Sequence, residues 1–455
     1  MELRATARRI LDEAMAAVRI DAAMLQAVRC ADGVLHVGSL SYRLAAFERV
    51  VVVAMGKAAG PMAEALMTAL RDAPRVEGVV VGATAPTVVD ARLRWMRGSH
   101  PVPDAASVAA ADAVLRLLRG CDARCLVLVL LSGGASSMVE RPLDGALNGW
   151  LSAEDAADLH RALVASGLPI AAMNTLRKHV SAVKGGRLAL AAGDATLCTV
   201  IVSDVRPGEE QVVGSGPTMA DATTVEDCRR IVADAGESLR LTAKLRAYLA
   251  SALLEETPKP GAVKGDVVVL LSSDDLCAAA QASAAALGFA AVVDNGCDEW
   301  EYRAAAEYLL CRAEMWLMEH ERVCVVSTGE VAVALDGEPG LGGRNQQFAL
   351  ECARLAAERM AAERRTAERG LRVVVLSAGS DGVDGNSVAA GAVVDATTVE
   401  RAAALGLSVE QALRRFDSYS LLAALGDAVV TGATGNNLRD LRLVLMERVP
   451  ERGMP

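Results

Sequence analysis

The chain has 455 residues, which is enough for two domains that each bury a core. Apolar residues make up 52 % and aromatic residues 3 %, which excludes a disordered chain and favours alternating helices and sheets. The net charge of −10 and the lack of any basic tract exclude nucleic acid as the expected partner. The first 20 residues have the pattern of an amphipathic helix without a signal core, and the longest apolar runs are too short to cross a bilayer. The ten cysteines have no zinc spacing and predict small core residues in a reducing compartment, so we expect a cytoplasmic protein.

In the first half of the chain, apolar β-rich runs alternate with alanine-rich helical stretches. The runs cover residues 49–55, 78–82, 124–132 and 197–204. Continuous apolar runs of this length are typical of strands buried on both faces. The alternation predicts a Rossmann-like, doubly wound and mainly parallel sheet.

The segment "EETPKPGAVKGD" interrupts this alternation, and its prolines, glycines and mixed charges predict a linker. The alternation then resumes, and "STGEVAVALDG" reads as two strand pieces meeting near Gly329, which predicts a mixed sheet. We therefore expect two α/β domains, covering 1–254 and 267–455, joined by a hinge at 255–266. The active site is expected in the cleft between them.

Polar loops follow several of the predicted strands, where open α/β sheets bind ligands. The loops are "AMGKAAGPM" (54–62), "LSGGASSM" (131–138), "VSDVRPGEEQVVGSGPT" (202–218) and "LSAGSDGVDGNS" (376–387). Only six of the 47 basic residues are lysines, so arginine is the ordinary surface cation. Lys57, at a strand-to-helix turn, is therefore a candidate phosphate-binding group, with chance retention on the surface as the alternative.

The segment "NTLRKHVSAVKGGRLA" (174–189) concentrates positive charge. Arg177, Lys178, Lys184 and Arg187 lie within eleven positions, and two glycines would let the backbone approach a ligand. The group fits a substrate that carries carboxylate and phosphate charge, and the alternative is a solvated basic helix face.

Two glycine-rich loops could hold anions. "LSGGASS" offers backbone N–H groups and hydroxyls at a predicted helix start. A serine-nucleophile loop is the alternative, but G-x-S-x-G is absent. "GLGGRNQQ" (340–347) also leads into a helical pattern, and it carries Arg344 where a P-loop would carry lysine.

Three aspartates are the acidic candidates. Asp381 and Asp384, between flexible glycines, can reach Mg²⁺ or a substrate hydroxyl, or they can simply form turns. Asp204 ends a predicted strand and can hold Mg²⁺ or accept a hydroxyl proton, with a helix cap as the alternative. The dinucleotide fingerprint, Walker A and the protein-kinase motifs are all absent.

Eight collinear motifs together carry a resemblance. They are "VVVAMGKAAGPM", "GSHPVPDAAS", "LVLLSGGASSM", "MNTLRKHVSAVKGGRLA", "IVSDVRPGEEQVVGSGPT", "STGEVAVALDGEPGLGGRNQQFAL", "LSAGSDGVDGNSVAAGA" and "DSYSLLAALGDAVVTGATGNNLRDL". The set resembles the class II glycerate 2-kinase family, which has a C-terminal MOFRL-type domain. The resemblance implies ATP- and Mg²⁺-dependent phosphorylation of D-glycerate at its 2-hydroxyl, and it aligns the family's cleft lysine and arginine with Lys57 and Arg344. Departures from the family's usual pattern are Gln347 and Val388, where acids are common, and Arg206, inserted among acids.

From the residues and the resemblance we expect the following roles. The catalytic residues are Lys57, Arg344 and Asp204, with Lys57 and Arg344 converging on the transferring phosphoryl group. The substrate-binding residues are Ser132, Arg177, Lys178 and Lys184. The nucleotide-binding residues are Gly133, Gly134, Ser136, Gly343, Asn345, Gln346 and Asn436. The Mg²⁺ ligands are Asp381 and Asp384. The expected partners are small molecules, and the expected state is a monomer or homodimer. The alternatives are an NAD(P)H-dependent hydroxypyruvate reductase and a non-catalytic ligand-binding protein.

Overall fold

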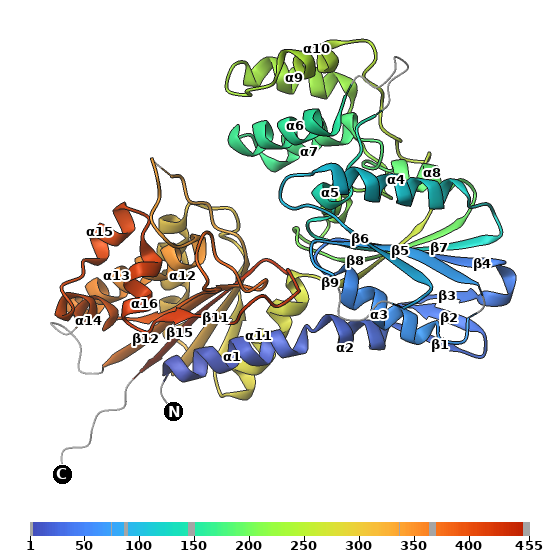
Figure 1. Ribbon diagram of the computed structural model, residues 1–455. Helices are drawn as coiled ribbons and strands as arrows, with labels where there is room; N and C mark the ends of the chain where they lie inside the picture. The colour runs from blue at the N-terminus through green and yellow to red at the C-terminus, as the bar shows by residue number, and fades with distance from the viewer. Residues whose placement is uncertain are drawn as a thin grey trace. The chain divides into compact units, whose positions relative to one another are not determined.

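The computed structural model describes residues 3–73, 75–85, 90–143, 151–335, 337–363 and 370–448. The chain forms two compact units, Ile20–Leu271 and the combination of Met1–Arg19 with Ser272–Pro455 (Figure 1). We call them the parallel-sheet unit and the mixed-sheet unit. Among the described residues, no helix has both the length and the apolar character needed to span a membrane.

The parallel-sheet unit is built on a six-stranded sheet. Its strands are β4 (Arg49–Met55), β5 (Val76–Gly82), β6 (Leu93–Arg97), β7 (Cys125–Ser132), β8 (Thr196–Val202) and β9 (Asp266–Leu271). They lie in the order β6-β5-β4-β7-β8-β9, and every neighbouring pair is parallel. All eight residues of β7 are buried, as the continuous apolar run predicts for a central strand. Helix α3 (Ala59–Ala69) covers one face, and α4 (Ala105–Arg119) with α8 (Arg187–Ala191) covers the other (Figure 1).

Further elements of this unit surround the sheet. Helix α2 (Ile20–Ala27) precedes a small antiparallel sheet of β1 (Val28–Ala31), β2 (Val34–Val37) and β3 (Leu40–Arg43). Short helical turns are η1 (Leu44–Ala46), α5 (Ala135–Met138) and η2 (Glu210–Ser215). Helices α6 (Ala153–Ala165), α7 (Ile170–Val180), α9 (Val225–Ala235) and α10 (Ala243–Ala250) form a helical layer with its own apolar core (Figure 1).

The mixed-sheet unit contains a second six-stranded sheet. Its strands are β10 (Ala290–Val293), β11 (Arg322–Gly329), β12 (Leu371–Gly379), β13 (Gly391–Asp395), β14 (Ala428–Val429) and β15 (Asp440–Arg448), in the order β10-β11-β15-β12-β13-β14. The pair β10–β11 is parallel and the other pairs are antiparallel. The helices are α1 (Leu3–Ala17), α11 (Ser273–Ala286), α12 (Tyr302–Leu317), α13 (Arg344–Glu363), α14 (Thr398–Ala404), α15 (Val409–Arg414) and α16 (Ser418–Ala424).

This architecture confirms the predicted fold class, a Rossmann-like parallel sheet plus an α/β domain with a mixed sheet. One predicted piece is wrong: residues 331–335 make only an isolated bridge, between Ala332 and Glu301, rather than a second strand. The predicted location of the active site in a cleft between the domains stays a prediction.

The division of the chain differs from the predicted one at both ends. Helix α1 belongs to the mixed-sheet unit, where Arg4 binds Asp395 at 3.0 Å. Strand β9, expected in the C-terminal domain, instead completes the parallel sheet beside β8. The predicted linker is packed against its unit, since Thr257 is buried and the Pro258 carbonyl accepts a hydrogen bond from the Asp221 amide. Local composition resembles a linker here because the segment is irregular, but packing makes it part of the fold.

Candidate functional site

Two loops meet at the carboxyl ends of β4 and β7. The Lys57 amide donates to the Gly133 carbonyl at 2.9 Å, and the Ala58 amide donates to the Ser132 hydroxyl at 3.0 Å. Gly56 makes this contact possible: its φ is +117°, and a Cβ there would stand 2.5 Å from the Ser132 carbonyl oxygen. The Lys57 side chain is exposed. The structure therefore brings together the lysine turn and the "LSGG" loop, as expected of loops at one edge of a parallel sheet.

Asp204 and His100 lie against the same glycine loop. A Cβ on Gly133 would stand 2.8 Å from Cγ of Asp204, and a Cβ on Gly134 would stand 3.1 Å from Cδ2 of His100. Packing around the imidazole and the positive charge of Lys57 both lower the pKa of His100. One lysine, one carboxylate and one imidazole that is neutral at pH 7 thus gather around two glycines, which is a set able to bind an anion and move a proton.

The serines of this loop have different surroundings. The Ser132 side chain is buried, and its hydroxyl also lies 3.5 Å from the Met55 carbonyl. It joins the two loops through these internal contacts, and its role as a substrate ligand stays a prediction. Ser136 is half-buried on the single turn of α5, and its predicted nucleotide contact stays a prediction.

Lys184 lies in a buried cluster of charges rather than in an open site. Its side chain is 1 % exposed and pairs with Glu140, and its Nζ lies 3.4 Å from Nε2 of His160. Burial alone would raise the pKa of Glu140, but Lys184 and His160 together outweigh burial and lower it to about 2. Burial and the same lysine lower the pKa of His160 to about 4. Arg177 is buried beside this cluster, and Glu140 is the charged group that acts on it.

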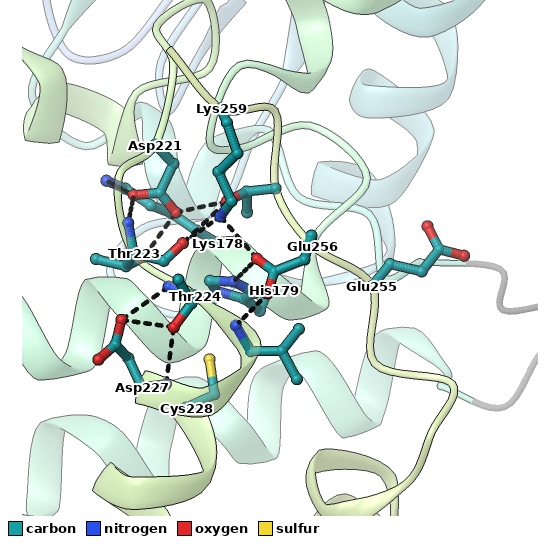
Figure 2. Close-up of polar contacts among 12 residues, drawn as sticks. Lys178, His179, Asp221, Thr223, Thr224, Asp227, Cys228, Glu255, Glu256 and Lys259 are labelled. Atoms are coloured by element: carbon teal, nitrogen blue, oxygen red, sulfur yellow. Dashed lines mark hydrogen bonds and ion pairs between the residues drawn. The ribbon is translucent and has the colours of Figure 1, made fainter. Parts of the chain in front are cut away.

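Lys178 is also buried and belongs to a polar network that Figure 2 shows. Its Nζ lies 3.3 Å from Asp221, whose other carboxylate oxygen accepts hydrogen bonds from the hydroxyls of Thr223 at 2.7 Å and Thr257 at 2.9 Å (Figure 2). Together these contacts hold two irregular segments onto α7. The substrate-binding roles of Arg177, Lys178 and Lys184 stay predictions, and the structure shows Lys178 and Lys184 paired with buried carboxylates. Helical spacing placed the charges on α7 and beside it, but could not show what packs over them.

In the mixed-sheet unit, Asp384 occupies the amino-terminal end of α13. One of its oxygens accepts from the Asn345 amide at 3.1 Å, and the other accepts from the Gln346 amide at 2.9 Å. Both side-chain amides donate to the same oxygens, at 3.3 and 2.9 Å. A Cβ on Gly343 would collide with this carboxylate, so glycine is required there. Burial raises the pKa of Asp384 to about 6, although the hydrogen bonds from these donors lower it.

The anion at this helix end is therefore part of the chain itself. The donors of Asn345 and Gln346 bind Asp384, and the predicted nucleotide contacts of these two residues and of Gly343 stay predictions. Each oxygen of Asp384 accepts two hydrogen bonds, and its assignment as a Mg²⁺ ligand stays a prediction. A carboxylate at a helix amino terminus is stabilised by the same N–H groups and dipole that would hold a phosphate.

Arg344 opens α13 and is held by two carboxylates. Its guanidinium contacts Asp440 at 2.6 and 3.0 Å and Glu330 at 2.7 Å. Burial opposes its charge, but the neighbouring carboxylates, led by Asp440 and Glu330, together outweigh burial and raise the pKa of Arg344. Its side chain remains 38 % exposed, so the guanidinium is both oriented and accessible.

Arg344 lines a cavity of about 620 Å³ that lies within the mixed-sheet unit. Asp381 and Asp440 supply further polar walls, and Val331 and Phe416 are among its apolar walls. Among the described residues, no group of three or more histidines, cysteines or carboxylates is placed to hold a metal, so the Mg²⁺ role of Asp381 stays a prediction.

Asn436 does not join the cavity wall. Its amide nitrogen donates to the Val18 carbonyl at 2.9 Å, and its amide oxygen accepts from the Asn437 main chain at 2.9 Å. These contacts tie the end of α1 to the loop before β15, and the nucleotide contact of Asn436 stays a prediction.

Known proteins match the chain over both units. Residues 6–250 match the family described as "Domain of unknown function (DUF4147)", and residues 323–440 match the MOFRL family. A Pyrococcus horikoshii protein named glycerate 2-kinase is 30% identical over 455 residues, which cover 98% of each chain. The crystal structure of a Thermotoga maritima glycerate kinase matches with a TM-score of 0.80 at 30% identity, covering 97% of this chain and 99% of that one. The chain belongs to the class II glycerate 2-kinase family. An Agrobacterium vitis relative, 35% identical over 88% of this chain and 87% of its own, carries the name hydroxypyruvate reductase.

The departures of this class II glycerate 2-kinase from the family pattern now have a structural setting. Gln347 is buried, and its amide nitrogen donates to the Leu413 carbonyl at 2.8 Å and to the Tyr302 hydroxyl at 3.2 Å. A carboxylate there would face a carbonyl that can only accept, so glutamine fits this environment. Val388 is 67% exposed, and its replacement of an acid leaves the described core unchanged.

Sequence reasoning missed several members of both sites. His100 lies in the quoted motif "GSHPVPDAAS" but was given no role, although it is one of only five histidines and lies in the loop that follows β6. Asp440 and Glu330, which orient Arg344, carry no local signal because they are 96 and 14 positions away along the chain and reach it only through the fold.

Proposed function

We propose that this protein is a D-glycerate 2-kinase, which transfers the γ-phosphoryl group of ATP to the 2-hydroxyl of D-glycerate and releases 2-phosphoglycerate and ADP. The observation that carries the proposal is the match to proteins named glycerate kinase over nearly the whole chain, including a solved structure. The missing dinucleotide fingerprint after β4 supports a kinase over a reductase.

The surroundings of Lys57 support a part in phosphoryl transfer. Its ammonium is exposed beside a glycine loop, where a compact charge can neutralise a phosphoryl oxygen. Asp204, half-buried against Gly133, is the candidate for accepting the proton of the substrate hydroxyl. The lowered pKa of His100 makes a neutral imidazole a second candidate for that proton.

The mixed-sheet unit supplies Arg344 to the proposal. A guanidinium oriented by Asp440 and Glu330 can bind two phosphate oxygens in a fixed plane. Because both partners are acidic, the cavity around Arg344 would repel a bare polyphosphate. A divalent cation bound to the nucleotide would remove that repulsion.

Mg²⁺ usually binds through one or two carboxylates together with substrate phosphates, so a three-carboxylate cage is not required. Asp204 and Asp381 are the carboxylates among the predicted site residues that fit this role, since Asp384 is already saturated. The cation supplies charge neutralisation on the nucleotide phosphates. We also propose action in the cytoplasm, which the ten free cysteines support.

Phosphorus NMR of a reaction with ATP, Mg²⁺ and D-glycerate tests the proposal. We expect ADP and 2-phosphoglycerate to form together, and the spectrum separates this product from 3-phosphoglycerate. ATP and D-glycerate left unchanged by the folded protein would refute it.

The name of the Agrobacterium relative favours hydroxypyruvate reduction as a second candidate function. An absorbance assay with hydroxypyruvate and NADH or NADPH separates the two. Oxidation of either coenzyme at a rate comparable to a kinase turnover would favour the reductase, and we expect none.

A further inference from the structure

Phe416 has a backbone conformation that its residue type disfavours. It follows the end of α15 with φ at +52°, in the left-handed region. The Phe416 amide bonds to the Leu413 carbonyl at 3.3 Å, and the Asp417 amide bonds to the Ala412 carbonyl at 2.9 Å. These two bonds define the Schellman ending of a helix, whose left-handed position is usually glycine.

The neighbouring helices provide an internal comparison. Helices α14 and α16 end with the same pair of bonds, and they place Gly406 and Gly426 at the left-handed position, with φ of +72° and +71°. Among the described residues, Phe416 is the only apolar side chain with a positive φ. A bulky residue that persists in a strained position is a reason to look for a function of its side chain.

Phe416 lines the cavity of about 620 Å³ that also holds Arg344. Much of the remaining apolar wall comes from the chain between β11 and α13, which includes Val331, Val333 and Pro339. The volume is within the range of small-molecule and cofactor sites, which are mostly apolar with a few polar groups. The aromatic content of the chain is only 3 %, so an aromatic ring at this wall is a specific feature.

Two buried polar atoms beside Phe416 have no hydrogen-bond partner among the described residues. They are the Ser418 hydroxyl and the amide oxygen of Gln347, and both residues line the cavity. The orientation of the Gln347 amide is fixed, because its nitrogen must face the Leu413 carbonyl. At this wall the amide oxygen of Gln347 can therefore accept a hydrogen bond from a ligand, and the Ser418 hydroxyl can donate or accept one. An adenine edge, with an amino group beside a ring nitrogen, presents this pair.

We propose that this cavity binds the purine base of the nucleotide, with the ring of Phe416 as its stacking platform. The proposal rests on the proposed kinase function for the identity of the nucleotide. The base lies against Phe416, Val331 and Val333, and Arg344 in the same cavity takes the phosphate end. Phe416 then positions ATP without touching the reacting atoms, so it is a positioning residue.

Nucleotide binding without turnover tests the proposal. The probes are adenosine, ADP with Mg²⁺ and inorganic tripolyphosphate with Mg²⁺, each titrated by calorimetry into the full-length protein. For wild type we expect adenosine alone to bind. For Phe416→Gly we expect the Kd for adenosine and ADP to rise at least tenfold, while the Kd for tripolyphosphate stays within twofold. Leu405→Ala, an exposed apolar residue at the end of α14, is the control and should leave all three values unchanged.

The Phe416→Gly variant distinguishes a role of the Phe416 side chain in binding from a role in stability. It suits φ of +52°, so Phe416→Gly should keep or raise Tm relative to wild type even as nucleotide binding weakens. Should its Tm fall by more than a few degrees, Phe416→Leu keeps apolar volume without an aromatic ring and should show the same loss of adenosine binding.

Two results would overturn the proposal. One is an unchanged adenosine Kd in both Phe416 variants, and the other is a wild-type protein that binds tripolyphosphate but not adenosine. Failure of the kinase function looks different: adenosine and ADP would bind through Phe416, but ATP and D-glycerate would give no 2-phosphoglycerate.

Discussion

Glu140→Gln should lower the free energy of unfolding strongly, although it changes the size of the side chain very little. The side chains of Glu140 and Lys184 are 3 % and 1 % exposed and form an ion pair. Glutamine keeps the volume but removes the charge, which leaves the Lys184 ammonium buried without a counter-charge from this position, with Nε2 of His160 at 3.4 Å. Breaking a buried pair from one side costs about 3–5 kcal/mol.

The pKa of Glu140 supports the same magnitude. A fall from its ordinary value of 4.5 to about 2 corresponds to about 3 kcal/mol of stability at neutral pH. For a unit of this size, the loss should lower Tm by about 10 °C. Urea unfolding followed by circular dichroism measures the free energy, and Glu48→Gln, in an exposed pair with Arg124, should change it by less than about 0.5 kcal/mol.

Lys184→Met completes a double-mutant cycle. The single variant should cost a similar amount, because it leaves the Glu140 carboxylate unpaired, and the double variant should cost much less than the sum. The KM for D-glycerate should stay within twofold of wild type in every variant that folds. A loss below about 1 kcal/mol in Glu140→Gln, or a large rise in KM for Lys184→Met at unchanged stability, would refute the structural role.

The same cluster predicts lability to acid. Both groups have depressed pKa values in the folded state, so each contributes stability above its unfolded pKa that is lost as pH falls. As pH falls, preferential protonation of His160 in the unfolded chain should lower stability first, between about pH 6.5 and 4. Protonation of Glu140 should lower it further between about pH 4.5 and 2. Unfolding free energies measured from pH 7 to pH 3 should therefore decline, and Glu140→Gln should flatten the lower part of that decline.

Three further substitutions test the two sites. Lys57→Ala should lower kcat at least about tenfold with little change in Tm, since the residue is exposed. The control Lys264→Ala, at another exposed lysine, should match wild type in a coupled ADP assay. Arg344→Lys should lower kcat/KM by at least about tenfold in the same assay, because lysine cannot repeat the two-pronged contact with Asp440. Gln347→Glu should destabilise the protein by about 2 kcal/mol at pH 7 by setting a carboxylate against a main-chain carbonyl, and Tm should recover partly as pH falls.

The glycine loop at α13 shows how far local reasoning extends. "GLGGRNQQ" has the composition of an anion-binding loop, and the structure confirms that an anion sits at its helix end. The anion is Asp384, 39 positions beyond Asn345. An amino-acid pattern can show that N–H donors need an acceptor, but a distant acceptor becomes visible only when the chain is folded.

Strand and helix periods, the parallel and mixed sheets, and the loops at strand ends all follow from the sequence by itself, because they depend on local alternation and on rules that hold for any parallel sheet. The turn that contains Lys57 and its contact with the "LSGG" loop were also predictable in this way. Tertiary structure alone decided which charges are buried. Lys178 and Lys184 look like surface cations in a one-dimensional pattern, but Asp221 and Glu140 reach them from 43 and 44 positions away. Whether a lysine meets a carboxylate, and whether the pair is shielded from water, depends on contacts that form only in the folded chain. The sequence therefore determined the residue types, and the fold determined which of them form buried ion pairs.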